Sequence, residues 1–136
     1  MEIETIKEFL DKKNIIGFVG ATIQKDKWGY KKYKEIKDAG FKVYPINPKY
    51  DNVDGDKCFP NIRSLIDFLH KKPDLVITII PPKITERIVE ECRDFGIDKV
   101  WMQPGSESEK AIKLCEENRI KVMYGVCIVV DALQKL

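Results

Sequence analysis

Residues 75–80 read Leu-Val-Ile-Thr-Ile-Ile and form the strongest strand pattern in the chain. A continuous run of apolar, mostly β-branched residues predicts a strand buried on both faces, as the strands of a parallel sheet are. Shorter runs of this kind alternate with amphipathic helical patterns along the chain, which is typical of βαβ units. The other predicted strands lie at 15–20, 42–46, 57–59, 99–103 and 121–124, and the predicted helices at 3–12, 29–39, 62–69, 83–95 and 106–118.

The alternation predicts one α/β domain over residues 1–136. We expect a Rossmann-like, doubly wound, mostly parallel sheet of five or six strands with helices on both faces, because right-handed crossovers produce that arrangement. The predicted strand order is 3-2-1-4-5-6, with the short run at 57–59 as the third strand, at the sheet edge. Ser106 and Glu109 have the spacing of a capping box, and residues 128–135 are expected to form a closing turn of helix.

Charge and hydropathy argue against several classes of partner. The chain carries 24 basic and 22 acidic residues, whereas nucleic-acid-binding domains usually have a strongly basic face. Its apolar runs are far shorter than the ~20 residues that a membrane-spanning helix needs. The first four residues, Met-Glu-Ile-Glu, lack the pattern of a secretory signal. We therefore expect a cytoplasmic protein without nucleic-acid or membrane partners.

Ligands of doubly wound sheets bind beyond the carboxyl ends of the strands, where the strand order reverses. Here that point lies between the strands at 15–20 and 75–80. The first strand ends in a reduced glycine fingerprint, Gly-Phe-Val-Gly-Ala-Thr at 17–22, in which Gly20 allows a phosphate to approach the backbone. The third glycine of a dinucleotide pattern would fall at position 23, which is isoleucine. Lys25, in the loop that follows, can neutralise a pyrophosphate.

The end of the second strand, Asn47-Pro48-Lys49, narrows the ligand class. A site for NAD normally has an acidic residue there, which accepts hydrogen bonds from the ribose hydroxyls. Lys49 puts a cation in that place and so favours a ribose that carries a phosphate. NADP, with a 2′-phosphate, and coenzyme A, with a 3′-phosphate, both meet this condition. The alternative is that Lys49 is a solvated surface lysine.

Histidine and cysteine offer little for metal or nucleophilic chemistry. The single histidine, His70, is predicted to lie in the middle of a helix, on the surface and remote from the cleft. The four cysteines contain no Cys-x-x-Cys pair, so neither a zinc site nor a Cys/His or Ser/His/Asp set is expected. Cys127 follows the last predicted strand, where it could approach a ligand, but no nearby residue is a base that would activate it.

Four stretches together resemble a known family. They are Val-Gly-Ala-Thr at 19–22, Val-Tyr-Pro-Ile-Asn-Pro-Lys-Tyr at 43–50, Gly-Asp-Lys-Cys-Phe-Pro at 55–60 and Trp-Met-Gln-Pro-Gly at 101–105. The combination is similar to the small stand-alone CoA-binding proteins, which share the fold of the CoA-binding domain of succinyl-CoA synthetase α subunits and ADP-forming acyl-CoA synthetases. The resemblance covers about residues 15–127. The chain departs from the family pattern in the loop at 23–28 and lacks the proline that often follows the cysteine.

The resemblance implies that the chain binds coenzyme A or a short acyl-CoA and has no catalytic centre of its own. Residues 19–22 would form the phosphate turn, Lys49 would reach the phosphorylated nucleotide end, and the turns at 80–82 and 102–104 would line the adenine and pantetheine arm. One alternative is an NADP-binding protein or enzyme. Another is a ligand-free interaction subunit of an acyl-CoA synthetase-like complex.

The expected partners beyond the coenzyme are a second copy of the chain or a synthetase-like subunit. Trp28 is a further predicted contact residue. It lies in the loop that follows the phosphate turn, from which its side chain could cover the adenine or the pantetheine arm. The predicted contact residues are Val19, Gly20, Ala21, Thr22, Lys25, Trp28, Asn47, Pro48, Lys49, Ile80, Pro81, Pro82, Met102, Gln103 and Pro104.

Overall fold

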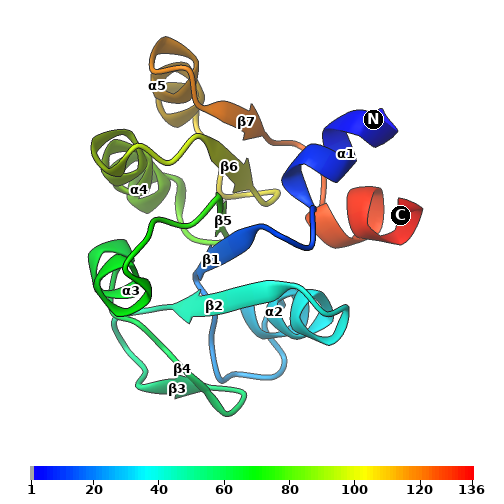
Figure 1. Ribbon diagram of the computed structural model, residues 1–136, viewed down its shortest axis with the longest axis vertical. Helices are drawn as coiled ribbons and strands as arrows, with labels where there is room; N and C mark the ends of the chain where they lie inside the picture. The colour runs from blue at the N-terminus through cyan, green and yellow to red at the C-terminus, as the bar shows by residue number, and fades with distance from the viewer. Residues whose placement is uncertain (1) are drawn as a thin grey trace.

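The computed structural model describes residues 2–136 and contains a five-stranded sheet with helices on both faces (Figure 1). All of its strand pairings are parallel, and the order across the sheet is β2-β1-β5-β6-β7. The predicted α/β, Rossmann-like fold class is therefore confirmed. The strands are β1 (Ile15–Val19), β2 (Lys42–Ile46), β5 (Leu75–Thr78), β6 (Lys99–Met102) and β7 (Lys121–Met123).

The helices bury two apolar clusters, one against each face of the sheet. Alternate residues of β5 show this directly, because Ile77 packs in one cluster and Val76 in the other. A run that faces two clusters can be apolar throughout, as the sequence at 75–80 is. One face is covered by α3 (Ile62–Leu69), α4 (Pro82–Phe95) and α5 (Glu109–Glu117), and the other by α1 (Ile3–Phe9), α2 (Trp28–Asp38), η1 (Ile128–Ala132) and η2 (Leu133–Lys135).

The prediction that 57–59 forms an edge strand of the main sheet is wrong. Instead, β4 (Asp56–Lys57) pairs with β3 (Asn52–Val53) in a separate antiparallel hairpin. Phe59 forms an isolated bridge to β2, where its N–H donates to the Pro45 carbonyl at 3.0 Å. A further ladder bond at Lys57 would need an N–H from Pro45, and proline has none. The main sheet therefore has the predicted strand order 3-2-1-4-5-6 without the outermost strand, number 3.

Two helix boundaries also differ from the prediction. The cap of α5 is Ser108, whose hydroxyl accepts a hydrogen bond from the Ala111 N–H at 3.0 Å, so the capping box predicted at Ser106 is wrong. Ser106 is buried and its hydroxyl lies 2.9 Å from that of Thr78, at the end of β5. His70 is exposed, but it ends α3 in a left-handed conformation with φ 58° instead of lying mid-helix. Among residues 2–136, no helix has the length and apolar content needed to cross a membrane.

Candidate functional site

The chain turns sharply after β1, and two glycines make the turn possible. Gly20 has a φ of +105°, and a Cβ added to it would lie 2.3 Å from the carbonyl oxygen of Ile79. Gly29 lies in the first turn of α2, where an added Cβ would lie 2.4 Å from the carbonyl oxygen of Gly20. The start of α2 therefore packs directly on the turn. Gly29, and not position 23, provides the close contact that the third glycine of a dinucleotide pattern supplies.

The start of α2 leaves backbone donors without a side-chain cap. Its N-cap residue, Lys27, makes no side-chain capping hydrogen bond, and the first turn contains no acidic residue. The first N–H groups of an α-helix have no partner within the helix, so those of Trp28 and Gly29 depend on solvent or a ligand. The helix dipole adds partial positive charge at the same place. Together these features suit an anion next to the glycine turn.

Hydrogen bonds tie segment 47–50 to the same turn. Asn47 donates through Nδ2 to the carbonyl of Ala21 at 2.9 Å, and its Oδ1 accepts from the Lys49 N–H at 2.9 Å. The hydroxyls of Thr22 and Tyr50 lie 2.9 Å apart, and this hydrogen bond lowers the pKa of Tyr50. The amide of Asn47 and the hydroxyl of Thr22, both predicted ligand contacts, are thus already bonded within the protein. The side chain of Lys49 is exposed.

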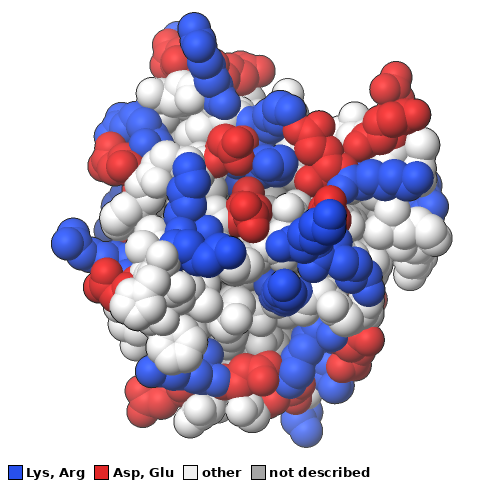
Figure 2. Space-filling model, viewed as in Figure 1, with Lys and Arg blue, Asp and Glu red and all other residues white. Residues whose placement is uncertain are grey.

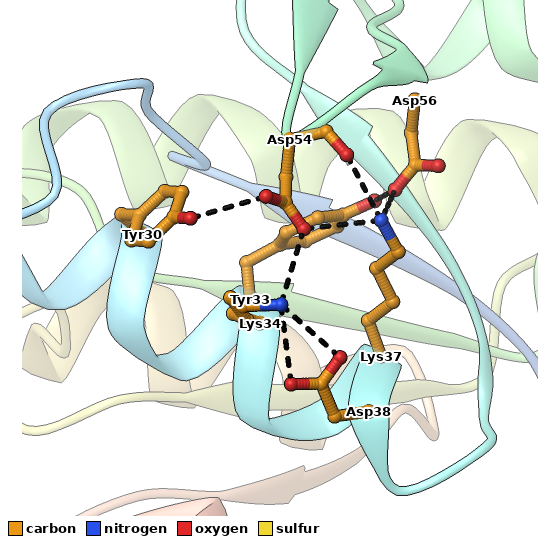
Figure 3. A network of polar contacts seen from close by, with 7 residues as sticks. All are labelled: Tyr30, Tyr33, Lys34, Lys37, Asp38, Asp54 and Asp56. Carbon is orange, nitrogen blue, oxygen red and sulfur yellow. Dashed lines mark hydrogen bonds and ion pairs between the residues drawn. The ribbon is translucent and has the colours of Figure 1, made fainter.

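A polar network fixes the β3–β4 hairpin, which follows segment 47–50, against α2 (Figure 3). Tyr33 donates to Asp56 at 2.6 Å, and Tyr30 donates to Asp54 at 3.1 Å. Lys37 Nζ lies 2.8 Å from the Asp56 carboxylate and 3.1 Å from that of Asp54. The hydrogen bond from Lys37 lowers the pKa of Asp54, while burial, followed by the bond to Asp56, raises the pKa of Tyr33. Segment 47–50 is therefore held from both ends, by the turn and by the hairpin.

A cavity of about 320 Å³ lies beyond the carboxyl ends of β5 and β6. It brings together three predicted contact residues, Trp28, Gln103 and Pro104. Trp28 is 63% exposed, whereas Gln103 is only 2% exposed. The remaining lining residues are Cys127, noted above as able to approach a ligand, and three that sequence reasoning missed, Lys32, Ile79 and Val130.

Gln103 joins the end of β6 to the C-terminal helical turn. Its Oε1 accepts a hydrogen bond from the Ile128 N–H at 2.8 Å, and its Nε2 donates to Cys127 Sγ at 3.4 Å. Trp101, two residues earlier in β6, donates through Nε1 to the Val126 carbonyl at 3.1 Å. These bonds set η1 as one wall of the cavity.

A second cavity of about 310 Å³ shares Ile79 and Pro104 with the first. Two more predicted residues, Ile80 and Pro81, line it. Pro81 is the N-cap of α4 and Pro82 its first residue, and neither has an N–H to offer. This helix start therefore resembles an apolar wall more than an anion site, in contrast to the start of α2.

The other predicted contact residues line neither cavity. Val19 and Met102 are buried within β1 and β6. Lys25, Pro48 and Lys49 are exposed and lie outside both cavities. Of the missed residues, Lys32 had one signal in the sequence, its position one helical turn after Trp28. The sequence predicts Ile79 inside a strand, and the place of Val130 depends on how the C-terminal helical turn packs.

Three of the four free cysteines are protected by burial. Burial raises the pKa of Cys58 and Cys92 and raises that of Cys115 to about 12. Cys127 is half-buried and faces the first cavity. In the described part of the chain, no group of three or more His, Cys, Asp or Glu residues is placed to hold a metal ion. Charges of both signs are interspersed over the face in Figure 2, in keeping with the net charge of +2.

A family described as CoA binding domain has a sequence model that matches residues 14–132. The chain belongs to this family. The resemblance noted at the four sequence stretches is thereby confirmed, and the cavities and the glycine turn lie in a CoA-binding domain. A conserved hypothetical protein from Pyrococcus furiosus has a similar solved structure, with a TM-score of 0.80 and 34% identity over 87% of this chain and 98% of that one.

The domain is also similar to parts of larger enzymes. An ADP-forming acetate–CoA ligase from Methanocaldococcus jannaschii is 34% identical over 82 residues, which are 60% of this chain and 11% of the ligase. The α subunit of ADP-forming acetate–CoA ligase II from Pyrococcus furiosus is 30% identical over 121 residues, 84% of this chain and 25% of the subunit. This CoA-binding domain therefore spans a quarter or less of the length of these relatives.

Proposed function

We propose that this domain binds coenzyme A, free or as a short acyl thioester, at the carboxyl edge of its sheet. The observation that carries the proposal is the contact between the Gly20 turn and the uncapped start of α2, together with two cavities that share Ile79 and Pro104, in a chain of this family. Coenzyme A needs an anion site for its pyrophosphate and a largely apolar path for its pantetheine arm. Both kinds of surface are adjacent here.

The pyrophosphate is assigned to the start of α2, where the N–H groups of Trp28 and Gly29 can donate to its oxygens. Lys49 is assigned to the 3′-phosphate. Asn47 fixes the Lys49 backbone, while the exposed side chain is free to reach a phosphate that lies over the end of β2. Lys25, also exposed, adds positive charge to the loop that follows the turn.

The pantetheine arm is assigned to the path that Ile79 and Pro104 share between the two cavities. The thiol end then lies in the first cavity, near Gln103 and Cys127. We assign no catalytic role to the chain's single histidine. His70 ends α3 just before the chain enters β5, so it lies at the amino edge of the sheet, opposite the proposed site.

One observation supports a second candidate ligand, and another supports a partner subunit. Lys49 in place of an acidic residue also suits the 2′-phosphate of NADP, which makes NADP the second candidate ligand. The ligase relatives are much longer than this domain, which supports a synthetase-like partner subunit as a further proposal.

The test is calorimetric titration of the wild type and two charge-reversal variants with CoA, dephospho-CoA and NADP. Lys49→Glu removes the proposed phosphate contact, and Lys42→Glu makes the same charge change at the exposed, amino-terminal end of β2. We expect Lys49→Glu to weaken CoA about tenfold, since a charge-assisted hydrogen bond is lost, while dephospho-CoA changes little. Lys42→Glu should leave both affinities unchanged. Equal losses for CoA and dephospho-CoA would remove Lys49 from this role, and tighter binding of NADP would make NADP the ligand.

A further inference from the structure

The polar side chains that line the first cavity offer mainly hydrogen-bond donors. Trp28, Ile79, Pro104 and Val130 give it apolar walls. Its polar side chains are Lys32 and Gln103, which face it together with the weakly polar thiol of Cys127. No carboxylate is among the described residues that line it. An occupant of this space therefore meets hydrogen-bond donors and little that accepts, which suits a molecule with exposed oxygen atoms.

Gln103 has donor capacity that the protein does not use well. Its side-chain oxygen is taken by the Ile128 N–H, and one amide hydrogen is directed at Cys127 Sγ, a weak acceptor, at 3.4 Å. An amide nitrogen carries two hydrogens, so within the described residues the second has no recorded acceptor. The residue as a whole is only 2% exposed, and a buried donor without a good acceptor is unfavourable. A carbonyl oxygen in the cavity would satisfy it.

Lys32 places a cation at the same cavity. Its side chain is only 11% exposed, and its Nζ lies 5.2 Å from the centroid of the Trp28 ring. Its recorded counter-ion is Glu35, 3.1 Å away, whose side chain is 41% exposed. The carboxylate partner is thus the more exposed member of the pair, while Lys32 is mostly buried and lines the cavity. A second carboxylate inside the cavity would meet Lys32 in a less polar environment, where the attraction is stronger than in water.

We propose that this cavity holds the acyl group of a bound thioester and that Lys32 gives it a preference for acyl chains that end in a carboxylate. Gln103 donates to the thioester carbonyl, and Lys32 pairs with the terminal carboxylate. At about 30 Å³ per water-sized group, a cavity of about 320 Å³ has room for the thiol end and an acyl chain of about four carbons. The inference rests on the proposed function, because it requires the CoA thiol to reach the cavity.

The test compares three probes, CoA, butyryl-CoA and succinyl-CoA, by calorimetric titration. The two acyl chains have the same length and differ in the terminal carboxylate. We expect the wild type to bind succinyl-CoA about tenfold more tightly than butyryl-CoA, the difference that one charge-assisted hydrogen bond makes. Lys32→Met should abolish this preference and leave butyryl-CoA unchanged. Lys31→Met is the matched control, because Lys31 also lies over the Trp28 ring, at 4.9 Å, but does not line the cavity.

A third variant tests the same idea in the opposite direction. Glu35→Gln removes the competing carboxylate and should increase the preference for succinyl-CoA, and it is informative even if Lys32→Met fails to fold. Equal affinities of the wild type for the two thioesters would overturn the acyl inference while leaving CoA binding intact. A uniform loss for all three probes in Lys32→Met would also overturn it, because Lys32 would then contact the nucleotide. Binding of none of the probes to the wild type would instead reject the proposed function.

Discussion

Replacing Gly29 with alanine tests the packing of α2 on the phosphate turn. Gly29 lies in the first turn of an 11-residue helix, and alanine usually stabilises a helix interior by about 1 kcal/mol relative to glycine. Helix propensity alone therefore predicts a more stable protein. The structure predicts the opposite, because the new Cβ would lie 2.4 Å from the backbone oxygen of Gly20. A backbone atom cannot rotate away as the end of a flexible side chain can.

The size of the effect follows from that distance. Real Cβ contacts essentially never fall below 3.0 Å, so the start of α2 and the turn must separate by at least the difference, 0.6 Å. Overpacking of this kind costs about 1–3 kcal/mol, which exceeds the gain in helix propensity at a terminal position. We expect a net loss of about 1–2 kcal/mol and a melting temperature lower by about 5 °C. The displaced N–H groups should also weaken CoA binding about tenfold.

The assay is thermal unfolding of Gly29→Ala followed by calorimetric titration with CoA well below the melting temperature. Gly96→Ala is the control, because Gly96 ends α4 with a φ of +75°, near the amino edge of the sheet. Its backbone strain should lower stability by about 1 kcal/mol without changing the affinity for CoA. A Gly29→Ala protein as stable as the wild type, with unchanged affinity, would refute the packing argument.

Three further predictions concern other parts of the site. Asp54→Asn should destabilise the domain at neutral pH, because Lys37 lowers the pKa of Asp54 below its ordinary value of 3.8. The stabilisation by the ionised carboxylate is present above that value and disappears as the pH falls through the lower pKa of the folded state. The difference in melting temperature between variant and wild type should therefore vanish in strong acid. Thiol titration of the native protein with Ellman's reagent should modify Cys127 alone, with CoA slowing the reaction, and rapid modification of more than one thiol would contradict the burial described. Asn47→Ala should lose about 1–2 kcal/mol of stability in denaturant unfolding, because it removes the bonds to Ala21 and Lys49, and an unchanged midpoint would show that these bonds contribute little.

Most of the fold can be predicted from the sequence, because the apolar runs and the residues at the helix ends indicate the same succession of strands and helices. The continuous run at 75–80 and the runs beside it predict the parallel sheet, and Asn61 caps α3 as its position suggests, accepting from the Ser64 N–H at 2.8 Å. The edge strand was predicted wrongly because propensity at 57–59 does not reveal that Pro45, twelve residues earlier, blocks the ladder. The capping box failed because Ser106 and Ser108 are both suitable caps, and only the burial of Ser106 beside Thr78 decides between them.

The sequence predicts where the candidate site lies, but it does not predict all of the residues that form it. Position at strand ends placed Gly20, Ile80 and Gln103 near one another, since the carboxyl ends of parallel strands share an edge. It could not show that the Thr22 hydroxyl and the Asn47 amide are used inside the protein, because those bonds depend on segments more than twenty residues apart. Lys32 was missed because its one signal, a position one helical turn after Trp28, is shared by Lys31. Its place at the first cavity depends on η1 and the loop after β6, which supply other lining residues.

The most direct test of the binding site is a titration of the ¹⁵N-labelled protein with coenzyme A, followed by two-dimensional NMR of the backbone amides. If coenzyme A binds at the carboxyl edge, the largest shifts should occur at Gly20, Trp28 and Gly29, with further changes near Lys49 and Gln103. The amides of α3 and of the amino edge around His70 should hardly move. Shifts concentrated at that opposite edge, or a spectrum that does not change at saturating coenzyme A, would contradict the account.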